Sequence, residues 1–194
     1  MIQKQVKPLD DKVILALNKQ DINRFDRIAC NQWSPRVAKV SDALALGTGL
    51  MYSYFLFKPE TQKESINIAG VAFQSLLLSQ SLSNALKLGL RNRPYLYNSQ
   101  VSMEEKRKVD ARMSFFSAHT STVSSFCYSF ALAHNTYFPD KKQTGIWIGA
   151  ITIPAIEGFL RVKAGKHYPS DVITGYLVGL GSSLIMHYLH KQRQ

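Results

Sequence analysis

Long stretches of this 194-residue chain contain no Lys, Arg, Asp or Glu. The longest span residues 65–86, 113–139 and 172–190, and shorter ones span residues 43–57 and 143–156. A soluble helix of such length normally places charged side chains on its outer face, whereas a bilayer core of about 30 Å needs about 20 residues without them. The distribution of charge therefore predicts membrane-embedded helices, although the mean hydropathy of -0.12 is ordinary for a soluble protein.

The uncharged stretches divide the chain into about five long helices. We expect an all-α fold, a bundle of transmembrane helices that span residues 40–57, 65–90, 119–139, 144–162 and 171–189. Consecutive helices of such a bundle alternate in direction, so the connections before the third and fifth helices fall on the same side. Functional residues in those two connections are thus predicted to meet at one end of the bundle.

The first 36 residues have a different character. They are polar and basic with scattered apolar residues, and they lack the compact apolar block that a secretory signal needs. We expect residues 1–36 to form an amphipathic segment at the membrane interface and residues 37–194 to form a single helical domain.

The chain has a net charge of +11, from 24 Lys and Arg against 13 acids. A basic excess fits nucleic acid, anionic lipid headgroups or a phosphorylated substrate. No Arg/Gly-rich segment or nucleic-acid module is present, so we expect no nucleic-acid partner. A lipid phosphate is both an anionic lipid and a phosphorylated substrate, so it fits the other two classes of partner together. The two cysteines, Cys30 and Cys127, have no metal-ligand spacing and are expected to be buried free thiols.

One stretch combines an arginine, a histidine and an aspartate at the start of the last apolar run. Arg161 precedes His167 by six residues, and Asp171 follows four residues later. An Asp that accepts from one imidazole nitrogen fixes the tautomer and leaves the other nitrogen basic, which prepares a nucleophile. Glu157 stands one helical turn before Arg161 and either holds its guanidinium or makes an ordinary structural ion pair.

Two earlier stretches carry compatible groups. Lys87, Arg91 and Arg93 leave the end of a helix before a proline, and they either neutralise a phosphate dianion or anchor the membrane boundary. Ser117 can cap the third helix, so that free N–H groups of its first turn form an anion site, and His119 can pass a proton to a leaving oxygen. The alternative for this stretch is a capped helix with an interfacial histidine.

Together the three stretches resemble the signature of the type 2 phosphatidic acid phosphatase superfamily, which reads KxxxxxxRP, PSGH and SRxxxxxHxxxD. The resemblance covers roughly residues 87–179. Arg161, His167 and Asp171 match the third motif in identity and spacing. The order and separation of the three blocks also agree, and three weak motifs in the right order make one strong signal.

The resemblance implies the fold of a membrane lipid phosphatase and a metal-independent hydrolysis without a cofactor. By it, His167 attacks phosphorus to form a phosphohistidine, Asp171 orients it, and His119 protonates the leaving group. The phosphate oxygens would be bound by three cationic side chains and by backbone N–H groups of the second motif, namely at Lys87, Arg93, Arg161, Ser117 and Ala118.

The chain departs from the signature at several positions. Five residues separate Lys87 from Arg93 where the family has six, so that either the helix end is adjusted or Arg91 shares the task of Lys87. Ala118 replaces the Gly of PSGH, Phe116 replaces its Pro, and Leu160 replaces the Ser of the third motif. None of these changes removes the nucleophile, its aspartate or the acid, so we expect an active enzyme with a modified phosphate cradle.

The expected substrate is a lipid phosphomonoester or pyrophosphate, such as phosphatidate, phosphatidylglycerophosphate, a polyprenyl pyrophosphate or a lipid A phosphate. The expected location is the bacterial inner membrane, with the active site facing the periplasm or exterior. Many relatives have a further transmembrane helix before the region that matches this N-terminus. The alternatives are a soluble exported acid phosphatase of the same superfamily, a vanadium haloperoxidase, and a membrane protein that binds phosphate without turnover.

Overall fold

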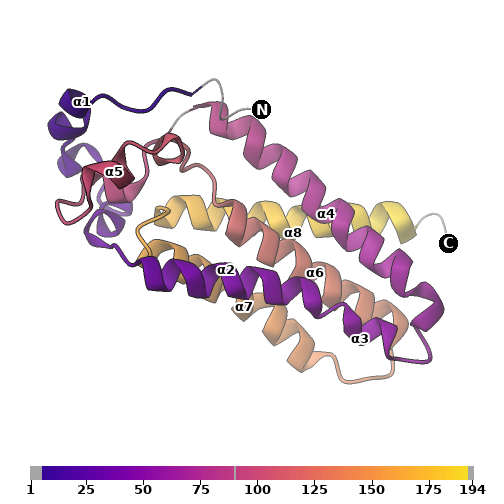
Figure 1. The fold of residues 1–194 in the computed structure, drawn as a ribbon. Coiled ribbons are helices and arrows are strands. Elements are labelled where there is room, and N and C mark those ends of the chain that lie inside the picture. The colour runs from indigo at the N-terminus through magenta and orange to yellow at the C-terminus, as the bar shows by residue number, and fades with distance from the viewer. Residues whose placement is uncertain (1–5, 90, 192–194) are drawn as a thin grey trace.

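The computed structural model describes residues 6–89 and 91–191, and it confirms the all-α fold. Five long helices run side by side, and no strand occurs among the described residues (Figure 1). The helices are α2 (Pro35–Leu50), α4 (Ser65–Leu86), α6 (Ala118–Tyr137), α7 (Thr144–Lys163) and α8 (Pro169–Lys191).

Shorter helices fill the connections. Most of them gather at the end of the bundle where α2, α6 and α8 begin (Figure 1). In chain order these helices are α1 (Asp11–Ala16), η2 (Lys19–Asp21), η3 (Asp26–Asn31), α3 (Ser53–Leu56), η4 (Gln62–Glu64), η5 (Lys87–Gly89), η6 (Pro94–Tyr97), α5 (Met103–Lys106) and η7 (Val109–Arg112).

The ends of two helices differ from the prediction. Helix α2 begins at Pro35 instead of residue 40, because Ser34 caps it by accepting a 3.3 Å hydrogen bond from the backbone N–H of Val37. It ends at Leu50 instead of residue 57, and the separate short helix α3 follows it. Helix α4 ends at Leu86, and the turn η5 follows it. Residue 90, the expected end of that helix, lies outside the described residues.

Helix α6 packs against the four other long helices, with α8 as its most extensive neighbour. Glycines make the close approach possible, because a Cβ atom on Gly175 would lie 2.6 Å from the carbonyl oxygen of Ser117. Buried serines link the helices further along. The Ser125 hydroxyl lies 3.2 Å from that of Ser79 in α4, and the Ser183 hydroxyl of α8 donates to the Ser125 carbonyl over 2.8 Å. Small and hydroxylated residues therefore replace large apolar ones between these helices.

Many of the large apolar side chains on the long helices instead point outward. Of the five helices predicted to span a membrane, α7 and α8 are the two among the described residues that are long and apolar enough to do so, and only 28% and 22% of their most apolar windows are buried. A core helix of a soluble protein would be mostly covered by its neighbours. The exposed large apolar residues of the long helices include Leu46, Leu50, Phe73, Leu77, Ile151, Phe159, Ile173, Leu177 and Ile185.

The described part of the N-terminal segment packs against the loops at the motif-bearing end. Ile14 is buried with Tyr95 and Leu96 of η6, and Cys30 is buried against Tyr168. Cys30 and Cys127 are both buried free thiols, as predicted. Residues 1–5 lie outside the described part, and the placement of this segment at a membrane interface stays a prediction.

Candidate active site

The predicted motifs meet at one end of the bundle because backbone hydrogen bonds join their loops. The Arg93 amide donates to the Ala111 carbonyl over 2.7 Å, and the Tyr95 amide donates to the Gly165 carbonyl over 3.2 Å. Gly165 has φ +72, and a Cβ atom there would lie 2.2 Å from the Gln32 carbonyl oxygen. Only glycine suits this turn, which brings the third motif against the first.

His167 is buried between an aspartate and an arginine. Its Nδ1 lies 3.6 Å from Asp171 Oδ2, which is longer than a hydrogen bond, and its Nε2 lies 3.5 Å from an Arg93 terminal nitrogen. Burial lowers the pKa of His167 to about 3, and the charges of Arg93 and Arg161 act in the same direction, against Asp171. The imidazole is therefore neutral at pH 7 and can act as a nucleophile.

The carboxylate of Asp171 is fully buried and has several donors. Arg91 donates to Oδ1 over 2.5 Å, while the Ser114 hydroxyl and the Tyr168 amide donate to Oδ2 over 2.5 and 3.0 Å. These bonds hold the carboxylate in place beneath the histidine. Arg91, one of the two residues proposed for the task of Lys87, thus binds Asp171 and also stacks on the Tyr168 ring at 4.2 Å.

Arg161 is buried near the end of α7 and points toward α2. One terminal nitrogen donates to the Ser41 hydroxyl and to Asp42 Oδ1, both over 3.1 Å. The Ser41 hydroxyl in turn donates to Glu157 Oε1 over 2.5 Å. The expected contact between Glu157 and Arg161 is therefore bridged by Ser41, from a helix that the sequence did not link to either residue.

Arg93 and Lys87 are the two cations of the first motif. Arg93 is anchored by its Nε, which donates to the Asp110 carbonyl over 2.8 Å, and by a terminal nitrogen that donates to the Lys166 carbonyl over 3.1 Å. Lys87 is partly buried in η5, and burial followed by the charge of Arg93 lowers its pKa. The two cations are thus close enough to repel, as expected of groups that share an anionic ligand.

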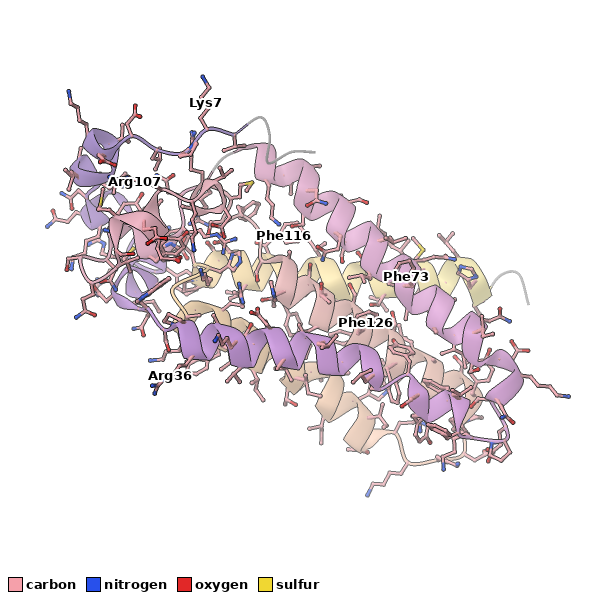
Figure 2. The ribbon with its side chains drawn as sticks, in the orientation of Figure 1. Lys7, Arg36, Phe73, Arg107, Phe116 and Phe126 are labelled. Atoms are coloured by element: carbon pink, nitrogen blue, oxygen red, sulfur yellow. The ribbon has the colours of Figure 1, made fainter. Side chains whose placement is uncertain are left out.

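The second motif forms the start of α6, which Figure 2 shows beside the labelled Phe116. Ser117 is its N-cap, as predicted, and accepts from the Thr120 amide over 3.3 Å. The Ser117 amide itself donates to the Asp171 carbonyl over 3.1 Å, so this N–H is engaged within the protein. Ala118 begins the helix, and the partly exposed His119 follows it with Nε2 3.0 Å from Asp42 Oδ1.

A groove of about 480 Å³ leads away from His119 between α2 and α4. Helix α6 forms its floor with Ala118, His119, Thr122 and Phe126, and Figure 2 shows Phe126 between the ribbons of α2 and α4. The walls come from Ala45, Leu46 and Gly49 of α2 and from Gln80 of α4. Most of this lining is apolar.

The model of the PAP2 superfamily matches residues 69–194. The chain belongs to the PAP2 superfamily. This membership agrees with the resemblance that the three motifs carry, and the matched region includes every motif residue named above.

Two curated relatives of this PAP2 chain are both named lipid A 1-phosphatase, one from Rhizobium johnstonii and one from Rhizobium etli. Each is 33% identical over 121 residues, which is 61% of this chain and 46% or 48% of the relative. The chain spans about half the length of these relatives.

Two solved structures share the fold. Aquifex aeolicus LpxE has a TM-score of 0.58 at 21% identity, covering 82% of this chain and 90% of that one. The first transmembrane PAP2 type phosphatidylglycerolphosphate phosphatase from Bacillus subtilis has a TM-score of 0.62 at 18% identity, covering 100% and 92%. At such identities the likeness shows the fold alone.

Several residues that contact the PAP2 motif stretches were not predicted from the sequence. Asp26, Ser41, Asp42 and Ser114 lie in segments to which no motif assigns a role. The only signal was the Ser34-Pro35 pair, which marks a helix start. It would have placed Ser41 and Asp42 in the first turns of α2.

Proposed function

We propose that the protein is a metal-independent membrane phosphatase that hydrolyses a lipid phosphomonoester or pyrophosphate through a phosphohistidine. The observation that carries the proposal is the neutral, buried His167 between Asp171 and the cations Arg93 and Arg161. Membership of the PAP2 superfamily and the names of the relatives support the same reaction class.

In the first step, His167 Nε2 attacks the phosphorus atom, because this nitrogen faces Arg93 while Nδ1 faces Asp171. An N–P bond forms as the bond from phosphorus to the leaving oxygen breaks. His119 gives its proton to that oxygen. Lys87, Arg93 and Arg161 offset the charge on the three remaining phosphate oxygens, with the Ala118 amide at the start of α6.

In the second step, a water molecule attacks the phosphorus atom of the phosphohistidine. His119 has lost its proton and now accepts one from this water. The N–P bond breaks, inorganic phosphate leaves, and His167 returns to its neutral form. Both steps balance without a metal or a cofactor.

A lipid substrate is favoured by the surroundings of the site. The apolar groove between α2 and α4 opens at His119, so an acyl or prenyl chain has a place to lie while its phosphate reaches the cations. The exposed apolar faces of α7 and α8 fit a bilayer better than water and oppose a soluble exported phosphatase. We propose the bacterial inner membrane as the protein's location, with the site facing the periplasm or exterior.

Phosphate release from a panel of lipid phosphates in detergent tests this function. The panel holds phosphatidate, phosphatidylglycerophosphate, undecaprenyl pyrophosphate and lipid A 1-phosphate. We expect turnover of at least one of them, abolished in His167→Ala and retained in His190→Gln, since His190 lies at the far end of α8 against Gln74. Equal background release by the unmodified protein and His167→Ala would overturn the proposal and favour a phosphate-binding protein without turnover.

A covalent trap tests the intermediate separately. Rapid acid-free quenching of the protein with ³²P-labelled substrate is expected to leave label on the protein that is lost in acid and stable in base, as for a phosphoramidate. The label should be absent from His167→Ala. Turnover without trapped label at any quench time would argue for direct attack by water.

A further inference from the structure

Asp42 stands in contact with two groups of the proposed reaction. Its Oδ1 lies 3.0 Å from His119 Nε2 and 3.1 Å from a terminal nitrogen of Arg161. The carboxylate is more than half exposed, whereas Arg161 is almost fully buried. Asp42 therefore lies at the mouth of the site, where α2 approaches the start of α6 and the end of α7.

We propose that Asp42 is the positioning residue of the leaving-group acid: its carboxylate holds the His119 imidazole by Nε2 and favours the protonated form, so that Nδ1 delivers the proton. This inference rests on the proposed function. It gives the site two carboxylate–histidine pairs, with Asp171 beside the nucleophile and Asp42 beside the acid.

The need for a carboxylate at this position follows from the charges around His119. Burial disfavours an imidazolium at His119, and the charges of Arg161 in α7 and Arg93 in the first motif act in the same direction. Asp42 of α2 is the carboxylate that offsets them among the described residues. Asp171 contacts the other histidine and Arg91 instead. Without Asp42, burial and the two guanidinium groups would act on His119 with no carboxylate to oppose them, and a smaller share of the acid would hold a proton.

A competing role for Asp42 is simple anchoring of Arg161. That role predicts a different result on substitution, because a displaced arginine weakens phosphate binding for every substrate alike. Loss of acid catalysis instead depends on the leaving group. A nitrophenolate leaves with little help from a proton, whereas the alkoxide of a lipid phosphomonoester needs one.

Asp42→Asn separates the two roles, since it keeps the size of the side chain and an oxygen for Arg161 but removes the charge. We expect kcat for phosphatidate to fall at least about tenfold, with kcat for p-nitrophenyl phosphate within about threefold of the unmodified protein. The basic limb of the phosphatidate pH profile should move to lower pH by about one unit, because the imidazolium loses its carboxylate. Asp42→Glu should recover part of the loss.

Glu60→Gln is the matched control, because Glu60 is an exposed carboxylate that faces Lys141 at 4.0 Å in a loop at the other end of the bundle. It should leave both substrates unaffected. An equal loss for both substrates, a change in KM alone, or no change in Asp42→Asn would overturn the assignment.

A titration of His119 does not depend on turnover, so it tests the pair with Asp42 even if the proposed function is wrong. In protein labelled with ¹³C at the histidine Cε1 atoms, the His119 signal is identified by its absence in His119→Gln. Asp42→Asn should lower the midpoint of its titration by about one unit or more. If the unmodified protein hydrolyses no phosphate ester, the proposed function falls and this midpoint alone decides: an unchanged value would refute the pairing.

Discussion

Asp26 is joined to Asp171 through a single guanidinium. The two terminal nitrogens of Arg91 donate to Asp26 over 2.7 Å and to Asp171 over 2.5 Å. Asp26 also accepts from the amide and hydroxyl of Ser170, over 2.9 and 2.7 Å. A residue of the N-terminal segment therefore supports the start of α8, next to the proposed nucleophile.

Replacing Asp26 with Asn should destabilise the protein. The substitution keeps the size of a buried side chain but removes the charge that Arg91 and Ser170 bind, at a cost of about 2 kcal/mol. For a chain of this size we expect Tm to fall by about 4–8 °C. Thermal unfolding in detergent, followed by circular dichroism, measures the change. Asp11→Asn is the control, because that exposed carboxylate pairs with an exposed Arg107, and an equal fall in both variants would refute the buried link.

The stabilisation by Asp26 should also depend on pH. Burial pushes the pKa of Asp26 up, but hydrogen bonds from Ser170, Asn23 and Arg91 outweigh it and leave the pKa below its ordinary value of 3.8. A carboxyl whose pKa is lower in the folded state stabilises the fold above its unfolded pKa, and this stabilisation is lost as pH falls through the folded value. The Tm gap between the unmodified protein and Asp26→Asn should therefore be constant from about pH 5 to 8 and shrink below about pH 4. A gap that stays constant down to pH 3 would contradict the shift.

Gly175 controls the approach of α8 to the second motif. A methyl group there would lie 2.6 Å from the Ser117 carbonyl oxygen, and this backbone atom cannot move without moving the start of α6. The adjoining bond from the Ser117 amide to the Asp171 carbonyl would be disturbed as well. We expect Gly175→Ala to lose most of its phosphatase activity and to lower Tm.

Gly181→Ala provides the comparison for Gly175→Ala within the same helix. A Cβ atom at Gly181 meets no atom within 4 Å, and alanine favours a helix over glycine by about 1 kcal/mol. Activity should be retained and Tm should be unchanged or higher. If both variants behave alike, the close packing at Gly175 does not matter for function.

Much of the fold follows from the distribution of charge. The uncharged stretches predicted α4, α6, α7 and α8 to within a few residues, because long helices in an apolar environment exclude charge along their whole length. The start of α2 was missed because Arg36, Lys39 and Asp42 charge its first turns. Those residues lie at the motif-bearing end, where the helix leaves the apolar region.

The sequence likewise predicted some residues of the candidate site and missed others. His167, Asp171, Arg161 and His119 were predicted because each lies within a motif of fixed spacing, and the structure brings these motifs to one end of the bundle. Asp26 and Asp42 were not predicted as site residues. Their contacts with Arg91 and His119 cross 65 and 77 positions of the chain and arise only from tertiary packing. No local pattern encodes such pairs.

The sequence leaves open whether Arg91 shares the task of Lys87, and the structure distinguishes the two residues. Lys87 lies near Arg93, whose charge adds to burial in lowering the pKa of the lysine, and Asp110, which acts against both effects, pairs with Arg93 at 3.5 Å. Arg91 is bound by Asp26 and Asp171. We therefore expect Lys87→Gln to raise KM and the inhibition constant of inorganic phosphate by about tenfold, with Tm unchanged, because a cation that binds phosphate contributes about 1–2 kcal/mol.

Arg91→Gln should give the opposite pattern. Loss of the guanidinium leaves two buried carboxylates without their shared partner, so Tm should fall by more than about 4 °C and kcat should fall with it as Asp171 loses its position. The inhibition constant of phosphate should change little for the folded fraction. Steady-state kinetics and thermal unfolding of the two variants, side by side, make the comparison. A raised inhibition constant in Arg91→Gln with Tm intact would mean that Arg91, and not Lys87, binds the phosphate.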